Sequence, residues 1–304
     1  MDKRAYYSAV AQNISILKGL GYVFSDGDYF CPLCMAPFTL EEVKKLLTEE
    51  DVPQASLGGK RITLTCRKCN SKCGSEIDIH LFNAIKAREQ SAFFPGTDRQ
   101  VVLLAEGKSI KANLQVGINK NFSLQINTEK TSPELWKFYY SNILLPNNTI
   151  DVKDVPLKRD SRRISSAIIK NAYCLLFAKT GYTILNDKHY DSMREQIKRP
   201  EPYILPERLW TIQNLPVPDG IYLTTDNQYR GFFVIYSLHL KLSYKVCVLI
   251  PTPKVDFLSA CIALRTFEPC SSILVNPLPN LDYLQDTNAI IRLRDWCYGW
   301  QMNF

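Results

Sequence analysis

Four cysteines in the first quarter of the chain have the spacing of a metal site. Cys31 and Cys34 form one Cys-x2-Cys pair, and Cys66 and Cys69 form a second pair further along. A Cys-x2-Cys turn places two thiolates on one side of a tight loop, and two such turns complete a tetrahedron around Zn2+. Reduced cysteines without a metal, or a redox pair, are the alternatives. Four thiolate ligands leave no open position for water, so we expect such a zinc ion to stabilise the fold and not to catalyse.

A fifth cysteine, Cys73, follows Cys69 by one helical turn, and the chain has ten cysteines in all. Cys73 could replace one of the four ligands, but we interpret it as a bystander. The remaining five are scattered among apolar neighbours, which is typical of small buried side chains in a cytosolic protein.

Oxygen-bearing side chains stand close to the second cysteine pair. Glu50 and Asp51 precede it, and Asn70 follows Cys69 directly. Carboxylate and amide oxygens are ligands that suit Mg2+ or Mn2+. The alternative interpretation is an acidic turn, formed by Glu49, Glu50 and Asp51, that is simply solvated.

The order of these residues resembles a known family. An acid, Pro53, the pair Gly58-Gly59 and a Cys-x-x-Cys-Asn run follow one another, in the segments LTEEDVPQASLGGK (47–60) and LTCRKCNSKCGSEID (64–78). This pattern resembles the HNH endonuclease family, in the branch whose ββα-metal element is built around a four-cysteine zinc knuckle. The resemblance covers about residues 28–85. It implies a treble-clef zinc module and metal-dependent hydrolysis of DNA phosphodiesters, with a role in restriction of foreign DNA.

The resemblance also implies residue roles, with one departure. In the family, the positions of Glu50 and Asn70 hold a divalent cation, and a histidine at the position of Asp51 is the general base. The resemblance therefore implies Glu50, Asp51 and Asn70 as catalytic residues and as ligands of Mg2+ or Mn2+. A carboxylate titrating near about 4 is a poor base at neutral pH, so Asp51 could be a weaker base or a second ligand. The alternative is a degenerate zinc-knuckle module that binds nucleic acid, or a partner protein, without cleaving.

Basic residues surround the same segment, and no acidic residue lies between positions 60 and 72. Phosphate backbones require such charges for affinity, so DNA is the expected partner. The candidate nucleic-acid-binding residues are Lys60, Arg61, Arg67, Lys68 and Lys72. Asp78 and His80 could supplement the site, although a solvent-facing His80 is the plainer interpretation.

The elements that must position these residues can be read from hydrophobic periodicity. We predict helices and strands over these ranges: helices 2–19, 40–47, 69–88, 161–178 and 255–265, strands 61–65, 232–236 and 246–250, and a hairpin over 114–126. Phe94-Pro95-Gly96 breaks the pattern. The predicted fold is α+β. An HNH-like zinc-knuckle module with its N-terminal helix occupies 1–95, and a larger mixed α+β domain occupies 96–304, where target selection or contact with a partner protein or another copy is expected.

Composition excludes several classes. The chain of 304 residues is 46% hydrophobic and 22% charged, which is ordinary for a folded protein. Its net charge of +7 permits nucleic-acid binding but does not indicate it. No apolar run approaches the ~18 residues that a membrane span needs, and residues 1–7 lack the apolar core of a signal peptide. We therefore expect a cytoplasmic protein without a membrane partner. A glycine-rich phosphate loop is also absent, which argues against an NTPase.

Overall fold

The computed structural model describes residues 2–143, 149–202, 204–205, 209–213, 215–224, 226, 230–266 and 273–299. The chain divides into two compact units. Unit 1 combines Met1–Phe82 with Asp160–Phe304, and unit 2 is Asn83–Arg159. This division differs from the predicted boundary at residue 95, because the N-terminal segment shares a core with helix residues that lie after position 160.

The N-terminal part of unit 1 contains a hairpin followed directly by a helix. Its elements are α1 (Lys3–Gly19), β1 (Tyr29–Phe30), β2 (Pro37–Phe38), α2 (Leu40–Leu46), β3 (Leu47–Val52), β4 (Lys60–Cys66) and α3 (Arg67–Cys73). Strands β3 and β4 pair antiparallel, with Leu47 opposite Cys66. A π-helical turn (Gly74–Asp78) joins α3 to α4 (Ile79–Ser91). The helix predicted over 69–88 is therefore present, and it is longer at both ends.

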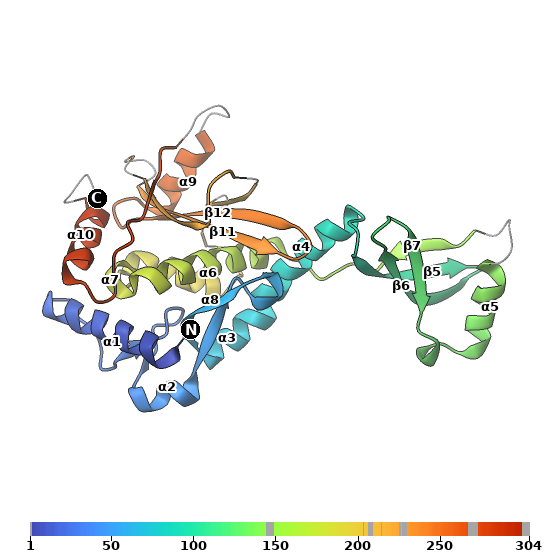
Figure 1. Cartoon of the computed structure of the whole chain (residues 1–304), viewed down its shortest axis with the longest axis horizontal. Coiled ribbons are helices and arrows are strands. Elements are labelled where there is room, and N and C mark those ends of the chain that lie inside the picture. Colours follow the sequence, from blue (N-terminus) through green and yellow to red (C-terminus); the bar gives the residue numbers. More distant parts are fainter. Residues whose placement is uncertain are drawn as a thin grey trace. The chain divides into compact units, whose positions relative to one another are not determined.

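Helix α6 (Ser161–Thr180) is the central element of unit 1 (Figure 1). Asp160 caps it by accepting a hydrogen bond from the backbone N–H of Arg163, and Gly181, at a φ of 58°, follows its last residue. One side of α6 contacts β3 and β4, and another contacts β11 (Gly231–His239) and β12 (Ser243–Pro251). Because α6 packs against both, the N-terminal hairpin and the C-terminal sheet belong to one unit.

The remainder of unit 1 is an antiparallel five-stranded sheet with surrounding helices. The strand order is β13-β10-β11-β12-β9. The elements not yet bounded are α7 (Tyr182–Leu185), α8 (Asp191–Lys198), β9 (Trp210–Ile212), β10 (Gly220–Thr224), α9 (Phe257–Thr266), β13 (Asn276–Pro277) and α10 (Thr287–Cys297). The strands predicted over 232–236 and 246–250 lie inside β11 and β12, which confirms both.

Unit 2 has its own sheet and core. The strand order is β7-β6-β5-β8. Its elements are β5 (Asp98–Ala105), β6 (Lys108–Val116), β7 (Phe122–Ile126), α5 (Pro133–Ile143) and β8 (Asp151–Asp154). The predicted hairpin is present as β6 and β7. Buried residues of β5 and β6 pack with Tyr139 of α5, whose hydroxyl donates to the carbonyls of Leu103 and Lys108. The structure is thus mixed α and β, as expected. Among the described residues, no helix is long and apolar enough to span a membrane.

Candidate metal centre and nucleic-acid interface

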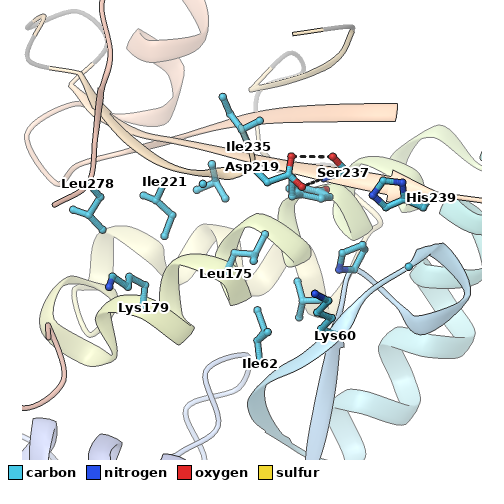
Figure 2. A pocket seen from close by; sticks show the side chains of 16 residues that line it. Lys60, Ile62, Leu175, Lys179, Asp219, Ile221, Ile235, Ser237, His239 and Leu278 are labelled. Atoms are coloured by element: carbon cyan, nitrogen blue, oxygen red, sulfur yellow. Dashed lines mark hydrogen bonds between the residues drawn. The ribbon is translucent and has the colours of Figure 1, made fainter. Parts of the chain in front are cut away.

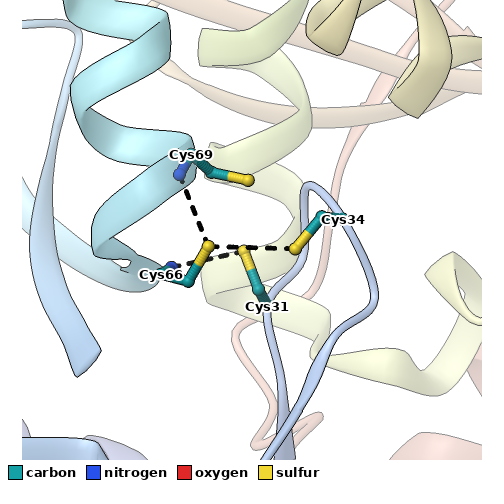
Figure 3. A group of neighbouring side chains, drawn as sticks. All are labelled: Cys31, Cys34, Cys66 and Cys69. Atoms are coloured by element: carbon teal, nitrogen blue, oxygen red, sulfur yellow. Dashed lines mark hydrogen bonds between the residues drawn. The ribbon is translucent and has the colours of Figure 1, made fainter.

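The four predicted cysteines come together in unit 1 (Figure 3). Their sulfur atoms all lie within 4.8 Å of one another, and the Sγ atoms of Cys34 and Cys66 are 3.8 Å apart. Backbone N–H groups point at the sulfurs: Cys66 donates to the Sγ of Cys31, and Cys69 donates to the Sγ of Cys66. Four thiols at this separation are compatible with a structural zinc site.

Each cysteine pair is placed by a different local structure. The first pair lies in a turn after β1, closed by hydrogen bonds from Met35 N–H to the Cys31 carbonyl and from Cys31 N–H to the Ala36 carbonyl. The second pair lies where β4 becomes α3, with Cys66 as the N-cap residue. Hydrogen bonds from the neighbouring cysteines lower the pKa of the Cys66 thiol. A thiolate is the form of cysteine that binds a metal.

Cys73 is not a member of this group in the described part of the chain. It is buried at the end of α3, and burial raises the pKa of its thiol to about 12. Its position outside the four-cysteine group agrees with its interpretation as a bystander.

The Gly58-Gly59 pair shapes the turn between β3 and β4. A Cβ atom at Gly59 would lie 1.3 Å from the carbonyl oxygen of Pro53, so no side chain fits there. Gly58 has a φ of 82°, and a Cβ on it would lie 3.0 Å from the Cβ of His239. The two glycines therefore let the hairpin close against Pro53 and pack against strand β11.

Glu50 is buried, and its carboxylate already has two partners. It accepts a hydrogen bond of 2.9 Å from the hydroxyl of Thr65 and one of 2.8 Å from the ammonium of Lys170. Lys170, on α6, is fully buried and also donates to Asp78 at 2.6 Å. One ammonium thus stands between two carboxylates, each contributed by a different part of the N-terminal segment.

Burial and charge act against each other in this group. Burial lowers the pKa of Lys170, but the carboxylates of Asp78 and Glu50 raise it by more, so the net pKa lies well above the ordinary value. Lys170 therefore carries its charge at neutral pH. Burial raises the pKa of Asp78, and Lys170 only partly opposes that shift.

Asp51 and Asn70 have partners different from those of Glu50. Asp51 is half-buried and lies 4.0 Å from the guanidinium of Arg61, which also pairs with Glu49 at 3.0 Å. Successive strand residues point to opposite faces, which explains why Glu50 and Asp51 have separate partners. Asn70 donates to the hydroxyl of Thr48 and to the carbonyl of Glu49. The predicted catalytic residues share the β3–β4–α3 element, but among the described residues no common partner links their side chains.

His80 is buried, with 2% of its surface exposed, so the solvent-facing interpretation was wrong. It is the second residue of α4, directly after the π-helical turn. Sequence reasoning also missed Lys170. The available signal was one lysine within the apolar run Ile168-Ile169-Lys170-Asn171-Ala172 of a predicted helix.

All five predicted nucleic-acid-binding residues are exposed. They are Lys60, Arg61, Arg67, Lys68 and Lys72. Arg61 pairs with Glu49 and Asp51, and Lys72 lies 3.8 Å from Glu76. The other three form no ion pair with the residues that the structure describes. Lys60, Arg67 and Lys68 therefore expose their charge to solvent on the β3–β4–α3 element.

A cleft of about 540 Å3 adjoins the same hairpin (Figure 2). Its walls are mostly apolar, and its cationic residues include Lys60 and Lys179. Asp219 accepts hydrogen bonds from the backbone and hydroxyl of Ser237, at 2.9 and 2.8 Å. Among the described residues, Ser237 donates to Asp219 and no hydrogen bond links either residue to His239, so these three do not form a nucleophile-and-base arrangement.

Comparisons of this chain with protein-family models, with curated proteins and with solved structures gave no match.

Proposed function

We propose that this chain binds nucleic acid through its β3–β4–α3 element, folded around a zinc ion, and that it does not hydrolyse the bound strand. The observation that carries the proposal is that this element exposes basic side chains to solvent and buries one of its acidic side chains. Its five basic side chains are exposed, whereas its Glu50 carboxylate is buried against Lys170. The element thus offers positive charge to a phosphate backbone and withholds the acid that a cation would need.

The zinc assignment rests on the donor set. Cys31, Cys34, Cys66 and Cys69 supply four sulfur atoms within 4.8 Å of one another, which suits a tetrahedral Zn2+. When bound, the ion supplies structural stability only, since four protein ligands leave no position for substrate. It would hold the turn after β1 against the start of α3, and so fix the direction of Arg67 and Lys68.

Lys170 argues against a catalytic cation at Glu50. Its ammonium, 2.8 Å from Glu50 and 2.6 Å from Asp78, supplies the positive charge that Mg2+ or Mn2+ would otherwise bring. A second cation beside a buried ammonium would be repelled, because charges interact more strongly away from water. Glu50 is therefore better explained as a structural partner of α6 than as a metal ligand.

Binding can be tested by the affinity of the full chain for a labelled DNA duplex. We expect the double variant Arg67→Ala/Lys68→Ala to bind roughly tenfold more weakly at physiological salt. The slope of log affinity against log salt concentration should become less steep by about 0.9 for each phosphate contact that is lost. Lys45→Ala is the matched control, since Lys45 is an exposed lysine on α2. Equal affinities for the double variant and the control would refute the proposed surface.

Metal-dependent hydrolysis of DNA is the second candidate, and Asp51 is the observation that favours it. Its side chain is 34% exposed, and it stands on the same element as Asn70. The resemblance to HNH endonucleases assigns both positions to the reaction. On this candidate, Asp51→His would restore the family's general base and raise the rate of plasmid nicking with Mn2+. On the first candidate neither wild type nor Asp51→His nicks DNA, provided that both retain zinc.

A further inference from the structure

A row of amide side chains crosses three strands of unit 2. Gln100 on β5 lies opposite Asn113 on β6, and Asn113 lies opposite Gln125 on β7. Residues directly opposite one another in an antiparallel sheet point to the same face. Their strand neighbours Val101 and Ala112 are in the hydrophobic core, so the amide row occupies the face away from that core.

The three amides line a groove of about 1020 Å3 that is rich in basic residues. The charged residues among its lining are Lys86, Asp98, Arg99, Lys111 and Lys130. Lys86 lies 3.9 Å from Asp98, and Arg99 pairs with Asp154 at 3.1 Å. Lys111 is exposed and forms no ion pair with the described residues. Basic groups therefore outnumber acidic ones in the groove.

Two buried polar atoms of the groove residues, the Nε of Arg99 and the Oδ1 of Asn113, lack a hydrogen-bond partner among the described residues. The Oδ1 atom of Asn113 is buried and accepts no hydrogen bond from the described residues. Gln125 and Gln115 donate to each other, at 3.1 and 3.2 Å, so Gln125 does not supply that bond. A buried acceptor without a donor costs free energy, which a ligand bearing N–H groups would recover.

The charge of unit 2 also suits an anionic ligand. Residues 83–159 contain eleven Lys and Arg against seven Asp and Glu, so this quarter of the chain holds more than half of the net charge of +7. A ligand that combines phosphate groups with hydrogen-bonding edges would satisfy both the basic groups and the amides.

We propose that this groove binds a single strand of nucleic acid and distinguishes its bases through Gln100, Asn113 and Gln125. Asn and Gln amides hydrogen-bond base edges through both a donor and an acceptor, and lysines contact phosphates without regard to sequence. In a single strand the bases can unstack, which leaves their edges free to hydrogen-bond with the amides of the groove, whereas in a duplex the Watson–Crick edges are already paired. This site goes beyond the duplex-binding surface proposed for β3–β4–α3 and does not depend on it.

The first test compares two lysine variants of the full chain. Lys111→Ala removes a groove lysine, and Lys137→Ala removes an exposed lysine of α5 that does not line the groove. We expect Lys111→Ala to weaken binding of a labelled oligonucleotide of about 12 nucleotides several-fold and to reduce the salt slope by about 0.7, with Lys137→Ala unchanged. Equal losses in the two variants, or no binding of single strands by wild type, would overturn the proposal.

The second test concerns base selectivity. Wild type should bind the four single-stranded homopolymers with different affinities. Asn113→Ala should reduce the ratio between the highest and the lowest of these affinities roughly tenfold, without changing the salt slope. Ser123→Ala, on an exposed position of β7 outside the groove, is the control. Equal affinity of wild type for all homopolymers would mean a polyanion surface and would contradict base reading. Since Arg67 and Lys68 are unchanged in these variants, failure here leaves the proposed duplex-binding surface standing.

Discussion

Lys170 is the residue on which the role of Glu50 depends. Its fully buried ammonium bonds to two carboxylates that lie more than ninety positions away in the sequence. Breaking a buried ion pair from one side leaves uncompensated charge, which destabilises a protein by about 3–5 kcal/mol.

We therefore expect Lys170→Met to lower the free energy of unfolding by about 3–5 kcal/mol, because Glu50 and Asp78 lose their shared partner. Lys179→Met, on the same helix but partly exposed, should cost no more than about 1 kcal/mol. Urea unfolding of both variants measures the difference. Similar stabilities for the two would show that the buried group contributes nothing specific.

Asp78 gives the buried group a pH dependence. Burial raises the pKa of its carboxyl in the folded state. Such a group loses stabilisation as the pH rises from the unfolded value near about 4 towards the higher folded value. Between these two pH values, the free energy of unfolding of wild type should therefore fall relative to that of Asp78→Asn, which has no carboxyl group to titrate. Comparing the two proteins at each pH cancels any protonation of the four clustered cysteines. A gain in the stability of wild type relative to Asp78→Asn would contradict the prediction.

The β3–β4–α3 element combines a closed hairpin with a helix that begins at a cysteine. Spacing alone was enough to predict the cysteine cluster, because two Cys-x2-Cys turns place four sulfurs in reach of one ion. The Gly58-Gly59 turn also had a local signal. The apolar run around Lys170 was a signal for its burial, but nothing local indicated its partners, because these depend on how α6 packs against β3. Sequence periodicity does not specify which elements meet.

Zinc content tests this element directly. Cys66→Ser should lose the bound zinc and unfold β3, β4 and α3, because Cys66 is both a predicted ligand and the N-cap of α3. Cys73→Ser should retain one zinc per chain, since Cys73 lies outside the four-cysteine group. Elemental analysis of the purified variants decides the matter. Well-folded wild type without zinc would refute the metal assignment.

At the scale of the whole molecule, each unit has its own core. The sequence break at Phe94-Pro95-Gly96 suggested a boundary there, but the chain returns to unit 1 at Asp160. A local sequence pattern indicates where a helix or strand ends. It does not indicate that a distant helix, α6, completes the core of the first unit. The predicted range 96–304 consequently included α6, which belongs to the same unit as the four-cysteine cluster.

Separate cores predict separate responses to loss of the metal. A strong zinc chelator should speed hydrogen exchange in β3, β4 and α3, while β5 and β6, which pack around Tyr139, keep their protection. Exchange measured by mass spectrometry with and without chelator checks this. Loss of protection in both units together would mean that they unfold as one.

The most direct test of binding without hydrolysis uses one sample. Wild-type protein containing zinc is mixed with end-labelled DNA and Mn2+ at concentrations where fluorescence anisotropy shows complete binding, and the DNA is then run on a denaturing gel. The account predicts that the DNA is fully bound and remains intact. DNA that is cut by wild type, and spared by Asp51→Ala and Asn70→Ala, would contradict it and establish the β3–β4–α3 element as a nuclease site.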